Sequence, residues 1–348
     1  MSFSKNFHPT SKGFAGLLFV PLSIAYGAVV GLRLFLFSVG LPRPQRVDGV
    51  RVISVGNITA GGTGKTPVTI MLARMIKENV AVVSRGYGRG SREPVQIVSD
   101  GAKILADYPD AADEALMCAR ALKTTPVVCA PKRVYGILAA AHLFGAKTVI
   151  LDDAFSHLSA HRDKNILLLD ATDPFGGGRL LPAGMLREPL SSLKRADAVV
   201  ITRANFAADS EVVALKEKIL SLAGKKIPIF TCDIKPASLL APDGSESMLE
   251  SLNGRKVKLL SGIGSPEQFE LTVKNLGAVV NAHFSFGDHH PFSEKELGKA
   301  VESLENGEIL LTTQKDVVRI PASFRAFFHI LTVEATVREA GFPAFIAE

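Results

Sequence analysis

Short apolar runs alternate with segments of helical apolar spacing along most of the chain. Runs of strand length occur at residues 51–56, 80–84, 126–130, 147–151, 165–171 and 196–202. Segments in which apolar residues recur every three or four positions lie at 66–79, 113–124 and 133–145. Because parallel strands are buried on both faces and are joined by crossover helices, this alternation predicts an α/β fold: a mostly parallel sheet with helices on both faces.

The C-terminal third of the chain repeats this style. Strand-like runs occupy residues 225–232, 256–263, 278–286 and 307–313, with helical segments between them. The nearest boundary markers are the Gly-Lys-Lys sequence at 224–226 and the turn-rich segment at 242–247. We therefore expect a first domain at residues 43–224 and a second, smaller α/β domain at 225–348, with a C-terminal segment that can pack back on the first.

The N-terminal segment, residues 1–42, has a different pattern. Residues 13–32 carry no charge, over about the length that a helix needs to span the hydrocarbon layer. Basic residues flank this run on both sides, so charge gives little orientation signal. Three interpretations compete: a cleaved signal peptide, a buried core helix, and a membrane anchor that spans the bilayer or lies in one leaflet. We favour the anchor, in which Pro21 would bend a spanning helix.

Composition narrows the class of protein. With 348 residues, of which 47% are hydrophobic and 21% charged, the chain can form two globular domains and is not disordered. Its net charge of +6 favours an anionic partner, such as a nucleotide, a nucleic acid or a membrane surface. The three cysteines are far apart, which argues against disulfides and against a zinc site. Aromatic residues make up 7% with no Trp, which argues against a nucleic-acid partner.

A glycine-rich loop follows the first strand-like run. Residues 57–67 read NITAGGTGKTP and precede a helical segment, as in a nucleotide-binding P-loop. In such a loop backbone N–H groups surround the phosphates, Lys65 reaches the β- and γ-phosphates, and Thr66 offers its hydroxyl to Mg²⁺. Thr59 stands where the strict pattern has glycine, so we expect an altered turn into the loop. The expected ATP-binding residues are Thr59, Ala60, Gly61, Gly62, Thr63, Gly64, Lys65 and Thr66.

A later strand-like run ends in a pair of acids. The sequence TVILDD brings Asp152 and Asp153 to the carboxyl end of a strand, where α/β sheets bind ligands. Together with Thr66, these carboxylates would hold the Mg²⁺ of a bound nucleotide. A helix N-cap is the alternative role for an Asp pair after a strand. The sequence thus predicts a P-loop NTPase-like domain with ATP and Mg²⁺ as cofactors.

The class of P-loop protein follows from the remaining motifs. A GTP-binding switch needs an Asn-Lys-x-Asp base-recognition motif, and the nearest string, TQKD at 313–316, has the wrong spacing. Two classes remain: a small-molecule or lipid kinase, and a nucleotide-dependent binding protein.

Further motifs occur in one order along the chain: SRGYGR (84–89), ADEALMCAR (112–120), LDDAFSH (151–157), LPAGMLREPLSSLKRADAVVITR (181–203), FGDHHPF (286–292) and TTQKD (312–316). Together with the glycine-rich loop they resemble the tetraacyldisaccharide 4′-kinase family, the lipid A kinases of Gram-negative bacteria. The resemblance implies transfer of the γ-phosphoryl group of ATP to the 4′-hydroxyl of a tetraacylated glucosamine disaccharide 1-phosphate, which gives lipid IVA. It also implies two α/β/α units joined by a hinge, acting at the cytoplasmic face of the inner membrane.

The same resemblance assigns catalytic roles, with Lys65 as one member of the set. Asp113 matches the family's catalytic acid and is expected to be the base for the acceptor hydroxyl, with a helix N-cap as its alternative role. His289 matches the acid's partner from the second domain, and the adjacent His290 is the competing candidate. Glu188, in LREP, matches a position near the nucleotide–metal site, with a surface salt bridge as the alternative.

Basic residues after a strand are candidates for binding the acceptor. Arg85 and Arg89 in SRGYGR suit phosphates, including the 1-phosphate of the acceptor, and a solvated basic loop is the alternative. Asn57 is a further candidate for substrate binding. We assign no chemistry to Lys315 and Asp316, which are hinge or domain-contact candidates. The motifs depart from the family pattern at Ala112, Ala154, Ser156 and Gln314.

The expected partners are the lipid-linked disaccharide and the membrane surface, with no obligate protein partner. The main rival hypothesis is a membrane-attached P-loop ATPase that controls a partner protein without acceptor chemistry. A second rival is a kinase for another amphiphilic sugar. An acid and a histidine that meet across a cleft distinguish the kinase from the ATPase, because a regulatory switch has no need to activate an alcohol.

Overall fold

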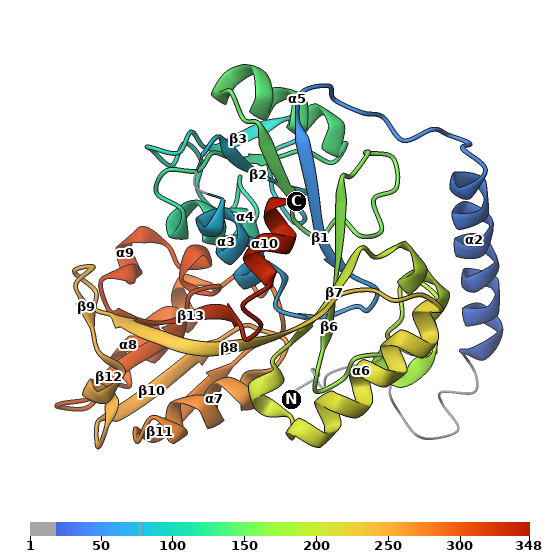
Figure 1. The fold of residues 1–348 in the computed structure, drawn as a ribbon. Coiled ribbons are helices and arrows are strands. Elements are labelled where there is room, and N and C mark those ends of the chain that lie inside the picture. Colours follow the sequence, from blue (N-terminus) through green and yellow to red (C-terminus); the bar gives the residue numbers. More distant parts are fainter. Residues whose placement is uncertain (1–18, 77) are drawn as a thin grey trace.

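The structure, a computed structural model, describes residues 19–76 and 78–348, and its strands form one continuous mixed sheet (Figure 1). The strand order is β11-β10-β12-β13-β8-β7-β6-β1-β5-β2-β4-β3, with β9 paired to β8. The N-terminal part supplies β1 (Arg51–Asn57), β2 (Val80–Ser84), β3 (Gln96–Ser99), β4 (Val127–Cys129), β5 (Thr148–Leu151), β6 (Lys164–Asp170) and β7 (Ala198–Thr202). The C-terminal part supplies β8 (Ile229–Leu240), β9 (Glu246–Ser247), β10 (Lys256–Ser261), β11 (Val279–Ser285), β12 (Ile309–Thr313) and β13 (Phe328–Val337).

Helices connect most of the parallel strands. They are α2 (Val20–Ser38), α3 (Lys65–Met75), α4 (Asp113–Ala121), α5 (Arg133–Phe144), α6 (Asp209–Ala223), α7 (Pro266–Asn275), α8 (Glu294–Glu302), α9 (Ala322–Arg325) and α10 (Phe342–Ala347). Short 3₁₀ turns occur at Gly176–Gly178, Leu190–Arg195, Ala204–Phe206, Leu249–Leu252 and Val317–Arg319. The strands and helices expected from the apolar pattern are present, with ends displaced by a few residues.

Alternate residues of the central strands pack on opposite faces of the sheet. Ile53 and Ile150 belong to a core formed with α3 and α4, whereas Val52 and Val149 belong to a core formed with α5. Successive side chains of a strand point to opposite sides, so both faces of a buried strand need apolar cover. The predicted α/β fold, with a mostly parallel sheet and helices on both faces, is confirmed.

Strand β8 joins the two parts of the chain and is longer than the run predicted at 225–232. Its first residues, 229–231, pair in parallel with β7, and its remainder pairs with β13 in antiparallel register, from Cys232 opposite Val337 to Leu240 opposite Ile330. The hydrogen-bonded sheet therefore continues through the boundary expected near residue 225. A division into domains at that point stays a prediction.

The C-terminal helix α10 lies against strands of the N-terminal part (Figure 1). Phe342 is fully buried, and its ring meets the ring of Phe230 edge to face at 4.8 Å. Arg51 in β1 donates to the carbonyl oxygen of Ile346, and Lys164 in β6 donates to that of Phe345. These contacts return the end of the chain to the sheet region near its centre.

Helix α2 stands at the edge of the molecule, and residues 13–18 of the expected anchor lie outside the described residues (Figure 1). None of the residues Val20–Ser38 is buried, so the core-helix interpretation is wrong for this segment. The expected bend at Pro21 is also wrong. The helix begins at Val20, and Pro21 occupies its first turn, where the missing N–H interrupts no helical hydrogen bond.

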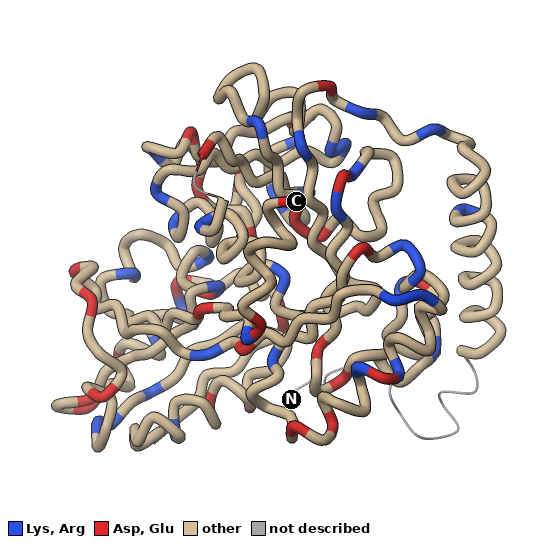
Figure 2. The backbone as a smooth tube through the Cα atoms, viewed as in Figure 1, with Lys and Arg blue, Asp and Glu red and all other residues tan. Residues whose placement is uncertain are grey.

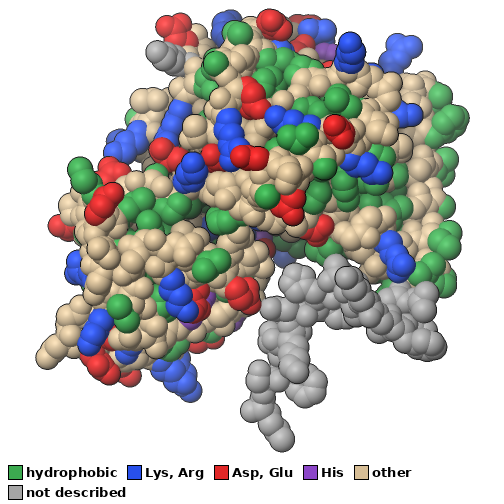
Figure 3. Space-filling view, turned by 60° about the horizontal axis from the view of Figure 1, so that its bottom comes forward, with side chains coloured by type: hydrophobic (Ala, Val, Ile, Leu, Met, Phe, Trp, Pro, Cys, Tyr) green, Lys and Arg blue, Asp and Glu red, His purple; other side chains and the backbone are tan. Residues whose placement is uncertain are grey.

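One side of α2 contacts the rest of the molecule. Ser23 donates to the carbonyl oxygen of Leu180, Tyr26 to that of Arg187 and Arg33 to that of Ser156, each at 2.8 Å. The other side is apolar and exposed. Arg33 is the one charged residue of Val20–Ser38, most of which is therefore drawn without charge in Figure 2, and Figure 3 shows hydrophobic side chains gathered at this edge. With a mean hydropathy of 1.8, α2 is long and apolar enough to associate with a membrane.

Candidate active site

The glycine-rich loop lies between β1 and α3, as predicted. Gly61 and Gly64 have φ angles of 105° and 74°, which glycine adopts without strain. Lys65 begins α3, and its ammonium lies 3.4 Å from the carbonyl oxygen of Gly61. Within the part of the chain that the structure describes, the backbone N–H groups of residues 61–66 form no hydrogen bond. Donors of this kind at a helix N-terminus form a phosphate-binding site.

Thr59 replaces glycine because the backbone is extended at this position. Its φ is not positive, and it pairs in antiparallel fashion with Leu186. The adjacent Ala60 N–H donates to the carbonyl oxygen of Met185 at 2.7 Å. Nδ2 of the buried Asn57 donates to Oγ1 of Thr59 at 3.2 Å. The altered entry to the loop is therefore an extended pairing with residues 185–187.

The paired acids after β5 lie beside this loop. Oγ1 of Thr69, one turn into α3, donates to Oδ1 of Asp152 at 2.9 Å. The Lys65 ammonium is 4.0 Å from Oδ1 of Asp153, and the Arg187 guanidinium is 2.9 Å from the same oxygen. Asp153 has a φ of 46°, a strained conformation for a residue with a side chain and one common at functional sites. The fold thus brings the glycine-rich loop, which is predicted to bind the phosphates, together with the predicted metal ligands.

The two acids have opposite electrostatic surroundings. Burial raises the pKa of Asp152 to about 7, and the nearby Glu114 and Asp153 carboxylates add to this effect. Burial also works to raise the pKa of Asp153, but Lys65 and Arg187 outweigh it and hold that pKa at about 2. A second positive charge beside Asp152 would therefore stabilise the ionised pair. Two carboxylates and the Thr66 hydroxyl are hard oxygen ligands, which fits Mg²⁺ whose remaining ligands come from a nucleotide and water.

Glu188 has a different set of contacts from these predicted ligands. Its side chain is 3% exposed, and the Arg195 guanidinium donates to its Oε2 at 2.6 Å. The Arg195 guanidinium also lies over the ring of Phe155, 4.7 Å from its centre. Among the described residues, no group of three or more His, Cys, Asp or Glu is arranged to hold a metal ion. A metal-binding role for Glu188 therefore stays a prediction, and its observed partner is the partly exposed Arg195.

Asp113 and His289 meet although 176 residues separate them in sequence. Nδ1 of His289 lies 2.7 Å from Oδ2 of Asp113. Asp113 begins α4 and is buried, and its Oδ1 accepts a hydrogen bond from the N–H of Glu114 at 2.8 Å. His290 instead contacts Glu296 and stacks on Phe286. Of the two adjacent histidines, the fold therefore pairs His289 with Asp113.

The pKa values of both members of this pair are shifted by their contacts with each other and by neighbouring charges. The hydrogen bond with Asp113 raises the pKa of His289, while burial and Lys315 oppose the rise. Burial works to raise the pKa of Asp113, but the hydrogen bond with His289, together with the charges of Lys315 and Arg319, leaves that pKa below its usual range. His289 also has a φ of 60°. An ionised acid that orients an imidazole is an arrangement suited to proton transfer.

Comparison with known proteins places the chain. The family model for tetraacyldisaccharide-1-P 4′-kinase, LpxK, matches residues 15–348. The chain belongs to this family. Tetraacyldisaccharide 4′-kinases of Syntrophus aciditrophicus and Halothermothrix orenii are 39% identical over 317 residues (87% of this chain, 84% of the relative) and 37% identical over 308 residues (84% and 80%).

A solved structure supports the same assignment. The crystal structure of LpxK from Aquifex aeolicus, described as a complex with ATP, is 33% identical to this chain with a TM-score of 0.79, and it covers 95% of this chain and 98% of its own. The resemblance inferred from the motifs is thereby confirmed. The protein is an enzyme, a phosphotransferase of the tetraacyldisaccharide 4′-kinase family.

The residues expected to bind the acceptor have unequal surroundings. Arg85 is exposed and has no hydrogen bond or ion pair within the described residues. The Arg89 guanidinium donates to the carbonyl oxygens of Cys129 and Glu93, and Asn57 is enclosed between Thr59 and Arg187. Through these contacts Arg89 and Asn57 stabilise the loops, whereas Arg85 is available to bind an anion.

Arg85 and three other arginines form a basic region around His157. Burial lowers the pKa of His157 to about 4, assisted by the positive charges of Arg133, Arg162, Arg33 and Arg85. Arg33 belongs to α2, so this basic region includes a residue of the apolar helix. Such a region favours an anionic group held close to a membrane surface.

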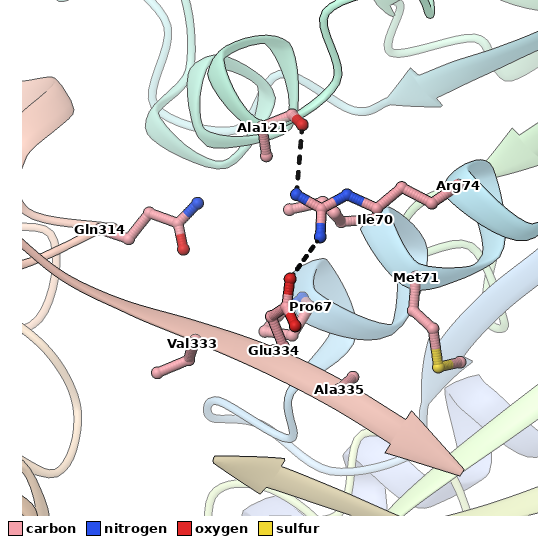
Figure 4. A pocket seen from close by; sticks show the side chains of 9 residues that line it. All are labelled: Pro67, Ile70, Met71, Arg74, Ala121, Gln314, Val333, Glu334 and Ala335. Carbon is pink, nitrogen blue, oxygen red and sulfur yellow. Dashed lines mark hydrogen bonds and ion pairs between the residues drawn. The ribbon is translucent and has the colours of Figure 1, made fainter. Parts of the chain in front are cut away.

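A separate pocket of about 210 Å³ lies between α3, the end of α4 and β13 (Figure 4). Arg74 reaches across it to Glu334 and to the carbonyl oxygen of Ala121, and Gln314 points into it from the turn after β12. The residues of the glycine-rich loop, 59–66, do not line this pocket. We therefore assign it no part in nucleotide binding.

Two basic residues of the site, Arg187 and Arg319, were missed from sequence, and a third, Lys315, was expected only as a hinge or domain-contact residue. Arg187 joins Asp153 to Asn57, Arg319 lies 3.7 Å from Asp113, and Lys315 lies 3.3 Å from His289. Arg187 directly precedes Glu188 in LREP, and Lys315 belongs to TTQKD, so both stood inside quoted motifs. Their partners are 26 or more residues away in sequence, where a local pattern carries no signal.

Proposed function

We propose that this enzyme transfers the γ-phosphoryl group of Mg·ATP to the 4′-hydroxyl of tetraacyldisaccharide 1-phosphate at the cytoplasmic face of the inner membrane. The observation that carries the proposal is the pairing of His289 with Asp113 in a chain that also forms a phosphate cradle. A nucleotide-controlled regulator needs the cradle but no alcohol-activating pair. Membership of the family supports the acceptor, and α2 supports a site at the membrane.

Phosphoryl transfer requires alignment, charge neutralisation and a group that takes the hydroxyl proton. The geometry favours His289 as that group. The Asp113 carboxylate is buried and engaged by Glu114 and His289, whereas the His289 side chain is 38% exposed with Nε2 on the side away from Asp113. We therefore reverse the roles expected from the family resemblance: Nε2 of His289 takes the proton, and Asp113 orients the imidazole and stabilises the cation that forms.

The nucleotide would lie on the donors of residues 61–66, with Lys65 facing the β- and γ-phosphates. Asp152, Asp153 and Thr66 would hold Mg²⁺, which when bound neutralises phosphate charge and orients the γ-phosphoryl group. Arg187 keeps Asp153 ionised and in place for this role. Arg133 supports both acids through their carbonyl oxygens, at 3.2 Å from Asp152 and 3.5 Å from Asp153.

The acceptor would approach from the side of α2. Its acyl chains stay in the bilayer, in which the exposed apolar side of α2 can be immersed. Arg85, within the basic region, is then the best-placed arginine for the 1-phosphate. In this arrangement the 4′ end of the disaccharide would lie near His289.

The test is a transfer assay with γ-labelled ATP and tetraacyldisaccharide 1-phosphate in detergent micelles. We expect the label in the lipid fraction, and we expect no labelled lipid with Lys65→Met. Label that is recovered only as free phosphate would support the regulatory ATPase instead. Equal labelling of an unrelated amphiphilic sugar would contradict the proposed acceptor while leaving the kinase activity standing.

A further inference from the structure

The turn that follows β12 is fixed by buried contacts and lies beside the pair formed by His289 and Asp113. Asp316, fully buried, accepts hydrogen bonds from Thr313 Oγ1 at 2.7 Å and from the Gly262 N–H at 3.1 Å. Arg319, 1% exposed, contacts Asp316 and donates to the carbonyl oxygens of Gly262 and His290 at 2.8 and 2.9 Å. The turn and the loop that carries His289 are thus fastened together, so the residue between Gln314 and Asp316 has a defined position.

That residue is Lys315, and its ammonium contacts the loop that carries His289. Lys315 Nζ lies 2.9 Å from Oδ1 of Asp288 and 3.3 Å from Nε2 of His289. The Lys315 side chain is 23% exposed, so it is partly accessible to solvent. The opposite ring nitrogen, Nδ1, faces Asp113. The imidazole of His289 is therefore held between a carboxylate and an ammonium.

The chemistry of these two neighbours selects one state of the ring. An ammonium group has only donors, so a contact with Nε2 requires a lone pair on that nitrogen. An ionised carboxylate has only acceptors, so Nδ1 must carry the proton. We propose that Lys315 is a positioning residue that fixes His289 as the Nδ1-protonated tautomer and so keeps Nε2 unprotonated. The acceptor hydroxyl then takes the place of the ammonium at the lone pair of Nε2 and transfers its proton to that nitrogen. This inference rests on the proposed function for its last step alone.

Other groups around the ring define what Lys315 opposes. Asp288 Oδ2 lies 3.7 Å from Nε2, and this carboxylate favours a proton there. Tyr87 meets the ring edge-on at 6.3 Å, and Arg319 acts on it through Asp113. Because Lys315 both binds Asp288 and faces Nε2, its removal leaves Asp288 as the nearest charged group to that nitrogen.

The first experiment measures the ring directly and needs no substrate. The ¹⁵N chemical shifts of the two His289 nitrogens, followed against pH in detergent micelles, report the tautomer and the pKa, and His289→Gln identifies the signals. In Lys315→Met we expect a proton on Nε2 over a wider pH range and a His289 pKa higher by about 0.5 to 1 unit. Lys315→Arg, which keeps the charge and the donors, should remain close to the parent protein.

Two further variants serve as matched controls. Asp288→Asn removes the competing carboxylate and leaves Lys315 in place, so it should lower the pKa of His289. Lys295→Met removes one positive charge from an exposed position of α8 with no contact to the site, and it should leave the ring unchanged. Opposite shifts in Lys315→Met and Asp288→Asn distinguish a specific contact from a general change of charge or loss of structure.

The second experiment concerns catalysis. In Lys315→Met the acidic limb of the profile of kcat/KM against pH should move to higher pH, by the same amount as the pKa of His289. The KM for ATP should not change. An unchanged tautomer and pKa in Lys315→Met would overturn the inference even if the enzyme phosphorylates the lipid. Absence of lipid phosphorylation by the parent protein would instead overturn the proposed function, and the measurements on the ring would still decide the role of Lys315.

Discussion

His289 and Asp113 differ in burial: the histidine side chain is 38% exposed and the acid 5%. A buried carboxylate that accepts two hydrogen bonds is a weak base, and a partly exposed imidazole whose other nitrogen is bound is the better proton acceptor. Sequence comparison with a family identifies both residues but does not order their roles. We infer the order from their burial and from which ring nitrogen Asp113 binds.

At this scale we predict separable effects of the two residues. His289→Gln should lower kcat by about a hundredfold to ten-thousandfold, because the proton acceptor is lost, with little change in the KM for ATP. Asp113→Asn should move the acidic limb of the pH–rate profile to lower pH, because the contact with Asp113 raises the pKa of His289. Steady-state kinetics from pH 5 to 9 measure both. A limb that stays in place in Asp113→Asn would contradict the assigned roles.

Helix α2 is an element whose two sides face different surroundings. Gly27 lets it approach the body of the molecule closely, since a Cβ there would lie 2.8 Å from Cδ1 of Leu180. The remaining surface includes Leu32 and Phe35, each 60% exposed. Apolar side chains exposed over a whole helix are unusual for a soluble surface and are typical of an element that lies in a membrane.

We therefore predict that Leu32→Glu and Phe35→Glu reduce recovery of the protein with membranes by about tenfold together, since each inserts a charge into an apolar surface. The thermal unfolding midpoint should change little, because both side chains are mostly exposed in the folded protein. Leu220→Glu, at an exposed leucine of α6, is the control and should leave membrane recovery unaltered. Equal recovery of all variants would exclude α2 as the anchor.

The whole molecule is held together by contacts between distant parts of the chain. Strand β8 pairs with strands of both parts, and α10 places Phe342 against Phe230 beneath the sheet. Arg51 and Lys164 bind the carbonyl oxygens at the end of this helix. The stability of the nucleotide-binding part therefore depends on residues at the C-terminus.

Phe342→Ala should lower the free energy of unfolding by about 3 to 5 kcal/mol, because it removes a fully buried ring and leaves a cavity. Denaturant titration with a probe near the glycine-rich loop measures the effect. Phe327→Ala, at a ring that is 46% exposed, is the matched control and should cost much less. If a probe elsewhere in the protein detects a large loss of unfolding free energy in Phe342→Ala and the loop probe does not, the two parts of the chain unfold independently.

Local patterns in the sequence determined the α/β class, the glycine-rich loop, the acids after β5 and the apolar N-terminal helix. Each depends on neighbouring residues: alternating apolar runs, glycines before a helix, or charge-free length. Strand β13, which pairs between β12 and β8, was missed although its sequence FHILTVEATV is rich in the β-branched residues typical of strands. Its place in the sheet is a matter of pairing, which the local sequence does not specify.

Only the tertiary structure chose His289 over His290, enclosed Asn57 and Arg89 within the chain, and brought Lys315 and Arg187 to the site. These outcomes depend on distances between residues far apart in sequence and on how much solvent each side chain keeps. A linear pattern records which groups are present. The folded chain decides which atoms meet, and proton transfer depends on those atoms.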